Sequence, residues 1–120
     1  MAFTHFNSQG HAHMVDVSAK DKTARTARAK GKIFMRRDTL ELVHTGGIQK
    51  GDVLSVAQVA GIMAAKRTWE IIPMCHPIQL TGVDISFAFE DDGIAVEACC
   101  RCTGETGVEM EALTAASTAC

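Results

Sequence analysis

The sequence has no tyrosine, one tryptophan and only two prolines among its 120 residues. Surfaces that bind single-stranded nucleic acid usually combine basic and aromatic side chains, so this scarcity argues against a nucleic-acid partner. The sequence also lacks an apolar run near the ~20 residues that a membrane span needs. Its first ten residues do not show the basic and then apolar pattern of a secretory signal. We therefore expect a cytoplasmic protein without a membrane partner.

The length fits one domain of ordinary size and is too short for two. Residues 1–22 show no sustained hydrophobic periodicity, so we expect a mobile N-terminal segment followed by a single domain over residues 23–120. The last apolar helical pattern runs to Cys120 without the glycine, proline or basic last turn that usually ends a helix. We therefore expect this domain to be incomplete at its C-terminus.

The five cysteines are an odd number, and without a secretory signal we expect them to be reduced. Three of them, Cys99, Cys100 and Cys102, lie on a predicted strand. Alternation along a strand would turn Cys100 and Cys102 inward and Cys99 outward, so the three thiols cannot converge on one metal ion. We expect buried thiols that act as small apolar groups, and no metal site.

The net charge of −2 hides an uneven distribution. Residues 20–37 contain eight of the twelve basic side chains and one acid, whereas residues 83–120 contain eight acids and one arginine. A basic segment of this kind either packs against the acidic one or presents a positive field to a polyanion. Because the chain as a whole is acidic, a small phosphorylated substrate is a better match for that field than a nucleic acid.

Period-two alternation predicts a strand over residues 23–35, with small side chains on one face and basic ones on the other. Alternation also predicts a hairpin in which residues 83–90 and 94–102 pair across a turn at Asp91 and Asp92. This hairpin has the clearest local pattern in the sequence.

Three helices are predicted from capping signals and apolar spacing. A short one follows Asp38, which has capping-box spacing to Glu41, and stops at Gly46. Asp52 caps a longer helix from Val53 to about Ile71, whose first half is apolar almost all round and is therefore expected to be buried on most sides. A capping box, Thr106 to Glu109, opens the last helix. Its alanine-rich face predicts tight packing, and Gly61 in the long helix predicts close approach of another backbone.

Both prolines lie in one short segment, Pro73-Met74-Cys75-His76-Pro77. Each proline fixes its own φ and moves the preceding residue, Ile72 or His76, toward an extended conformation. A rigid segment that holds an imidazole is a plausible functional site, because the charge of histidine changes near neutral pH. A structural turn with a solvated histidine fits the same residues.

Lys50 and the pair Glu109 and Glu111 are the remaining candidates. Lys50 lies between two glycines just before a helix, where an ammonium and backbone amides can bind an anion, although an exposed loop lysine explains the same pattern. Residues two apart on a helix project about 200° from each other. Glu109 and Glu111 therefore cannot form a carboxylate pair within one chain unless the first turn is distorted, and Glu111, which the capping box does not use, is the better site candidate.

Five segments together carry a resemblance to a known family. They are Ala-His-Met-Val-Asp at 12–16, Lys-Gly-Asp-Val-Leu at 50–54, Ala-Gly-Ile-Met-Ala-Ala-Lys-Arg-Thr at 60–68, Ile-Pro-Met-Cys-His-Pro at 72–77 and Thr-Gly-Val-Glu-Met-Glu-Ala-Leu-Thr-Ala at 106–115. In this order they closely resemble the molybdenum cofactor biosynthesis protein C family of cyclic pyranopterin monophosphate synthases. The resemblance covers nearly the whole chain.

The resemblance implies a lyase that converts 3′,8-cyclo-7,8-dihydroguanosine 5′-triphosphate, a cyclised GTP derivative, into cyclic pyranopterin monophosphate and diphosphate. It implies no cofactor. The implied fold is α+β and ferredoxin-like, an antiparallel sheet with helices packed on one face. The implied assembly is a homohexamer built from dimers, with pockets between subunits.

The resemblance also implies the site residues. The substrate-contacting segments of the family fall on Met74, Cys75 and His76 and on Met110 and Glu111, with Glu109 alongside, and its loop lysine falls on Lys50. With Lys50, a basic side chain of the first strand such as Arg25 would neutralise the triphosphate. His76 and Glu111 would hold the base or move protons. The implied catalytic set is therefore Lys50, His76 and Glu111.

One departure from the family matters for catalysis. Members of the family continue past the final helix into Asp-Met-Cys-Lys, whose aspartate is the candidate general acid or base and whose lysine is its catalytic neighbour. Neither residue stands in this sequence, so neither role is assigned. The alternative to an active synthase is a catalytically weak, phospholigand-binding subunit of the same assembly.

Overall fold

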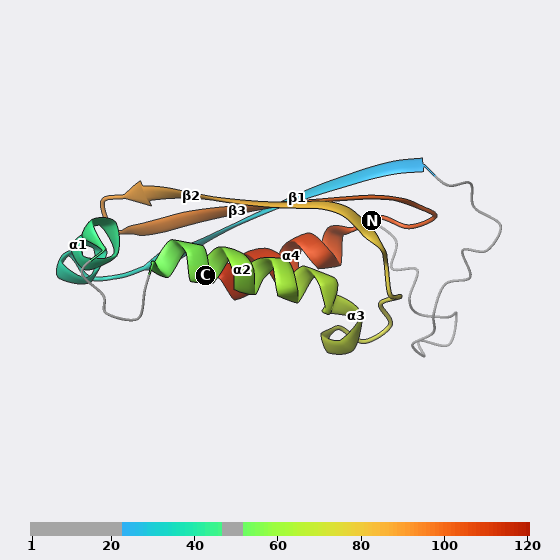
Figure 1. The fold of residues 1–120 in the computed structure, drawn as a ribbon, viewed down its shortest axis with the longest axis horizontal. Helices are drawn as coiled ribbons and strands as arrows, with labels where there is room; N and C mark the ends of the chain where they lie inside the picture. Colours follow the sequence, from blue (N-terminus) through green and yellow to red (C-terminus); the bar gives the residue numbers. More distant parts are fainter. Residues whose placement is uncertain (1–22, 47–51) are drawn as a thin grey trace, which may run out of the picture.

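A computed structural model describes residues 23–46 and 52–120 (Figure 1). The predicted mobile segment, residues 1–22, lies outside the described residues. Within them the chain forms seven elements in this order: β1 (Thr23–Phe34), α1 (Arg37–Thr45), α2 (Val53–Lys66), α3 (Thr68–Ile71), β2 (Leu80–Glu90), β3 (Gly93–Gly104) and α4 (Glu109–Ala119).

The strands form one antiparallel sheet in the order β1-β3-β2. Helices α2 and α4 lie side by side along one face of it, and α1 lies at one end (Figure 1). The predicted α+β fold, with an antiparallel sheet and helices on one face, is confirmed. No helix in the described ranges combines the length and the apolar character needed to cross a membrane.

The predicted strands are confirmed by their pairing and by their alternating burial. On β1, Ala29 is buried against the helices, whereas the side chains of Arg28 and Lys30 are exposed on the other face. The hairpin pairs β2 with β3 from Leu80 to Glu90. Lys32 of β1 lies 2.6 Å from Glu90 and 2.5 Å from Asp92, so an ion-pair cluster joins the end of β1 to the hairpin turn.

The core between sheet and helices is built largely from small side chains. Ala112, Ala115, Ala116 and Ala119 of α4 are all buried, as its alanine-rich pattern predicts. They let α2 approach closely at Gly61, where a Cβ would overlap the tip of Ile85 and lie 3.1 Å from the Ala115 carbonyl oxygen. The predicted close approach of another backbone at Gly61 is therefore confirmed.

Two predicted capping boxes are wrong. The amide of Met35 still donates to the carbonyl oxygen of Asp92 at the hairpin turn, so the chain stays with the sheet up to this residue. Helix α1 begins directly afterwards, with Arg36 as its N-cap and Asp38 inside its first turn. At α4 the N-cap is Val108, without a side-chain cap. Val108 is completely buried, so its contacts with the core outweigh the local capping preference of Thr106.

The long helix predicted from Val53 to Ile71 is divided in two. Arg67 separates α2 from α3. The buried hydroxyl of Thr68 donates to the carbonyl oxygens of Ala64 and Ala65, each at 3.0 Å. These are acceptors at the end of α2, and a side chain that binds them competes with a continuing backbone ladder.

The expectation that α2 is buried on most sides is also wrong. Val56, Val59 and Met63 are 61%, 56% and 49% exposed in the isolated chain. The sheet and α4 cover one side of the helix and leave this apolar row on the other. We call Val56, Val59 and Met63 the open face of α2.

Asp52 caps α2 as predicted, because its carboxylate accepts from the amides of Leu54 and Ser55 and from the Ser55 hydroxyl. The hydroxyl bond and the amide bonds lower the pKa of Asp52. An acid whose pKa is lowered in the folded state stabilises the fold above its unfolded-state pKa, near 3.9, and this stabilisation is lost as the pH falls.

We expect Asp52→Ala to lower the thermal midpoint at pH 7 but not at about pH 2. Asp38→Ala is the control, because Asp38 lies in the first turn of α1 but does not cap it. It should lower the midpoint less than Asp52→Ala does, and an equal fall in both variants would contradict the capping role of Asp52.

Candidate active site

Most of the residues predicted to form the site lie at the end of the sheet opposite α1 (Figure 1). The start of β1, the end of β3, the start of α4 and the segment that leads into β2 meet there. Arg25 of β1 and Leu80 of β2 are both register partners of Cys102 on β3, so Cys102 marks the centre of this end.

The two prolines enclose a tight turn. The amide of Cys75 donates to the carbonyl oxygen of Ile72 at 3.3 Å. Met74 has a φ of 71°, the one positive φ outside glycine in the described residues. This matches a type II turn with Pro73 in its favoured position, but that turn normally has glycine where Met74 stands. The proline-rich segment therefore begins with a turn, and Met74 stores backbone strain.

Glu111 is buried, with an exposed fraction of 4%, although it is a carboxylic acid. Burial raises its pKa, and the charge of Glu109 raises it further, against a hydrogen bond from its own amide. No basic side chain pairs with Glu111 in the described parts of the chain. Glu109, by contrast, is exposed, so the two glutamates do project apart as predicted.

The negative charge of Glu111 affects the pKa of three cysteine thiols. Burial, and then the negative charge of Glu111, raise the pKa of Cys75 and Cys102, and they raise the pKa of Cys100 to about 11. This coupling brings Glu111 of α4 together with Cys75 of the proline-rich turn, a pair that are 36 positions apart in sequence. Sequence reasoning treated Cys100 and Cys102 only as core, and missed that the charge of Glu111 raises the pKa of both thiols.

Arg25 faces the helices from β1. Its Nη2 donates to the backbone carbonyl of Glu105 at 3.3 Å, and its Nε is buried without a partner among the described residues. The positive charge of Arg25 lowers the pKa of the Cys102 thiol, which the charges of Glu111 and Glu109 raise. Arg25 therefore lies with the two glutamates around Cys102, and it connects β1 to the loop that leads into α4.

The other predicted site residues are less closely placed. His76 is half-buried in the segment that leads into β2, and Met110 is exposed on α4. Lys50 lies outside the described residues. The structure thus brings together Arg25, Cys75 and the two glutamates.

The cysteines of β3 are oriented as predicted. Cys100 and Cys102 belong to the core cluster, whereas Cys99 faces the opposite side, where Arg101 donates from Nη1 to its sulfur at 3.4 Å. Arg101 covers Cys99, so this outward thiol is buried as well. Within the described ranges, no three His, Cys, Asp or Glu side chains form a cluster that could hold a metal ion.

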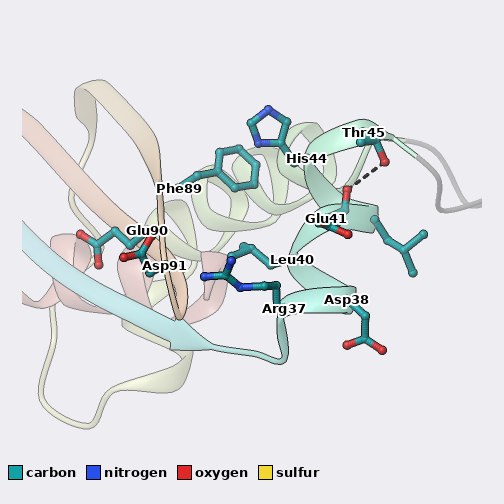
Figure 2. A pocket seen from close by; sticks show the side chains of 10 residues that line it. Arg37, Asp38, Leu40, Glu41, His44, Thr45, Phe89, Glu90 and Asp91 are labelled. Atoms are coloured by element: carbon teal, nitrogen blue, oxygen red, sulfur yellow. Dashed lines mark hydrogen bonds between the residues drawn. The ribbon is translucent and has the colours of Figure 1, made fainter.

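A groove of about 930 Å³ lies at the other end of the molecule, between α1 and the hairpin turn (Figure 2). The ring of His44 lies 4.5 Å from that of Phe89, between centroids, and the groove wall also carries Arg37, Glu41 and Glu90. None of the predicted site residues lines it. Sequence reasoning missed this groove, because only an amphipathic pattern in α1 hints at it.

Comparison with known proteins identifies the family. The MoaC family profile matches residues 14–120. The chain belongs to the MoaC family. Relatives within the MoaC family are named cyclic pyranopterin monophosphate synthase. The protein from Brevibacillus brevis is 62% identical over 117 residues, covering 97% of this chain and 73% of its own length.

Two further members of the MoaC family carry the same name. The protein of a Thermoanaerobacter species is 59% identical over 121 residues, covering 99% of this chain and 77% of its own length. The protein of Desulfitobacterium hafniense is 57% identical over 120 residues, covering 99% of this chain and 74% of its own length. The resemblance read from the five sequence segments is therefore confirmed.

Met74 offers a direct test of strain at the site. We expect Met74→Gly to raise the free energy of unfolding by roughly 0.5–1 kcal/mol, because relief of the positive φ exceeds the entropy cost of glycine. The same variant should lower turnover, since it loosens the turn that carries Cys75 and His76. Urea unfolding and a kinetic assay measure the two effects. Ala88→Gly, in a strand without positive φ, is the control and should destabilise; a destabilised Met74→Gly would show that the turn is unstrained.

Proposed function

We propose that this chain is a cyclic pyranopterin monophosphate synthase. It would convert 3′,8-cyclo-7,8-dihydroguanosine 5′-triphosphate into cyclic pyranopterin monophosphate and diphosphate. The observation that carries this proposal is the identity of 57–62% to relatives of that name over nearly the whole chain. The clustering of buried Glu111 with half-buried Cys75 and Arg25 at one end of the sheet supports it.

The charges of the cluster suit a triphosphate substrate. Arg25 has a guanidinium nitrogen without a partner among the described residues, and with Lys50 it would neutralise the phosphates and the departing diphosphate. Glu111, whose burial raises its pKa, would hold a proton more readily than an ordinary glutamate and could donate it during ring opening. His76 would share that proton transfer, and Met74, Cys75, Glu109 and Met110 would contact the substrate.

We also propose a homo-oligomer, a hexamer built from dimers, in which pockets form between subunits. The open face of α2 supports this, because a row of three exposed apolar side chains on one helix is typical of an interface. Ile71 of α3 and Leu113 of α4 add further exposed apolar area. Sedimentation of Val59→Asp against the parent chain would test it, and unchanged sedimentation would reject this face as an interface.

The compartment that we propose is the cytoplasm. All five cysteines are free in the structure, and reduced thiols persist in a reducing compartment.

The decisive experiment supplies the substrate and measures diphosphate and pterin product together. We expect equal amounts of the two, and we expect Lys50→Ala to lower kcat/KM by about 100-fold because a phosphate-neutralising charge is lost. Lys30→Ala is the matched control, since Lys30 lies on the exposed face of β1. Equal rates for both variants would remove Lys50 from the site. Substrate that binds without yielding product would reject the synthase proposal.

A further inference from the structure

The burial pattern changes phase along the segment that runs from His76 into β2. His76, Ile78 and Leu80 are half-buried, whereas Pro77, Gln79 and Thr81 are exposed. Farther along, the inward positions are odd: Val83 and Ile85 pack toward the helices, and Asp84 and Ser86 are exposed. Even positions face inward before Thr81, and odd positions face inward after it.

A β-bulge causes the change. Leu80 pairs with Cys102 and Gly82 pairs with Arg101, so two steps on β2 correspond to one step on β3 and Thr81 is the extra residue. A regular ladder would place Thr81 opposite Cys102. Residues 76–79 precede β2, but their burial alternates as on a strand. The same alternation in the regular register would turn Gln79 and Pro77 inward and His76 outward.

The sequence itself selects the bulged register. Ile78 and Leu80 pack against the core cluster, and a regular ladder would replace them inside by Gln79 and Thr81. On the opposite face of the sheet, Arg101 holds the strand just after the bulge through an ion pair with Asp84 at 2.5 Å. Gly82 leaves room for this arginine, since a Cβ there would lie 2.8 Å from its Nη2.

We propose that Ile78 and Leu80 are positioning residues for His76, and that the bulge at Thr81 lets them keep their inward phase against β3. Their burial before the bulge sets the inward phase that His76 shares with them. Bulges next to active sites re-aim side chains in this way. The inference rests on the proposed function only for the part that His76 plays in turnover, because the direction of the side chain can be measured without substrate.

Two variants remove the bulge, and they differ in whether the even or the odd positions before it face inward. Deleting Thr81 leaves Leu80 opposite Cys102 in a regular ladder, so His76 stays inward. The fourfold variant Ile78→Gln, Gln79→Ile, Leu80→Thr and Thr81→Leu keeps the composition but moves the apolar pattern to odd positions, so His76 turns outward. Diethyl pyrocarbonate modification of His76, mapped by peptide mass, reports its accessibility in the full chain. Alkylation of buried Cys100 and Cys102 reports unfolding.

We expect Cys100 and Cys102 of the fourfold variant to stay protected from alkylation, which shows that it is folded. Diethyl pyrocarbonate should modify its His76 several-fold faster than in the parent chain. Its kcat/KM should fall by about 100-fold because the imidazole is misplaced. The deletion variant should retain the protection of His76 and most of the turnover. Protection of His76 in a folded fourfold variant, or its exposure in the deletion variant, would overturn the proposal. If the fourfold variant unfolds, the milder double variant Leu80→Thr and Thr81→Leu takes its place, with the same expected change at His76. A parent chain that shows the expected His76 reactivity but no turnover would reject the synthase proposal and leave this one standing.

Discussion

Glu111→Gln is expected to raise the thermal unfolding midpoint at pH 8 while lowering kcat by about 10²–10⁴-fold, the usual contribution of a general acid or base. Glu111 is 4% exposed and pairs with no basic side chain in the described residues. Ionising it in that place costs free energy that glutamine, with the same shape and no charge, avoids.

The sign of the pH dependence follows from the raised pKa of Glu111. An acid whose pKa is higher in the folded state binds more protons there, so stability falls as the pH rises above the unfolded-state value near 4.3. The parent chain and Glu111→Gln should therefore be equally stable at about pH 3. Their midpoints should separate as the pH rises and reach a constant difference above the folded-state pKa.

Calorimetric scans from pH 3 to pH 8 measure this separation. Glu109→Gln is the matched control for stability, because Glu109 lies on the same helix turn and is exposed; its midpoint should stay close to that of the parent. The rate of Cys75 alkylation against pH gives an independent check, since loss of the Glu111 charge should lower the pKa of Cys75. A midpoint difference that stays constant with pH would show that Glu111 is ionised without cost.

Gly61→Val is expected to lower the free energy of unfolding by about 2 kcal/mol, the usual cost of overpacking a core. A Cβ at Gly61 would overlap Ile85 and would lie 3.1 Å from the carbonyl oxygen of Ala115 and 3.2 Å from the Cβ of Ala119. Ile85 can move its terminal methyl, but the backbone of α4 can move only with the whole helix. The gain in helix propensity over glycine, a few tenths of a kcal/mol, is too small to compensate.

Urea unfolding of the variant measures this loss. Lys66→Val is the control, because it introduces the same β-branched side chain at an exposed position of α2 that is not part of the open face. The control should change stability by only a few tenths of a kcal/mol. Equal losses in both variants would assign the effect to β-branching and not to the contact between α2 and α4.

The predictions that succeeded depend on local pattern. Alternation along β1 and the hairpin follows from a period of two, and Gly46 ends α1 in the left-handed conformation that glycine adopts easily. The nearness of Glu111 to Cys75 was expected only from the resemblance, because no local rule connects a helix to a turn so far away in the sequence.

The predictions that failed depend on contacts that the sequence does not display. The start of α4 is fixed by the burial of Val108, and the break after α2 by the hydroxyl of Thr68. The bulge is an instructive intermediate case. Its cause, apolar residues at even positions up to Leu80 and at odd positions from Val83, is visible in the sequence, but the predicted strand began only at Val83 and so missed the change.

The place of β1 in the sheet gives the basic segment a second consequence. With the strand order β1-β3-β2, this strand of twelve residues is an edge, and one row of its backbone amides and carbonyls has no partner in the described sheet. Such an edge can template aggregation with any extended chain, and charged side chains such as lysine are a known protection. Arg28 and Lys30 project from this edge strand. Repulsion between like-charged strands would therefore help newly made copies to avoid amyloid-like pairing while they fold.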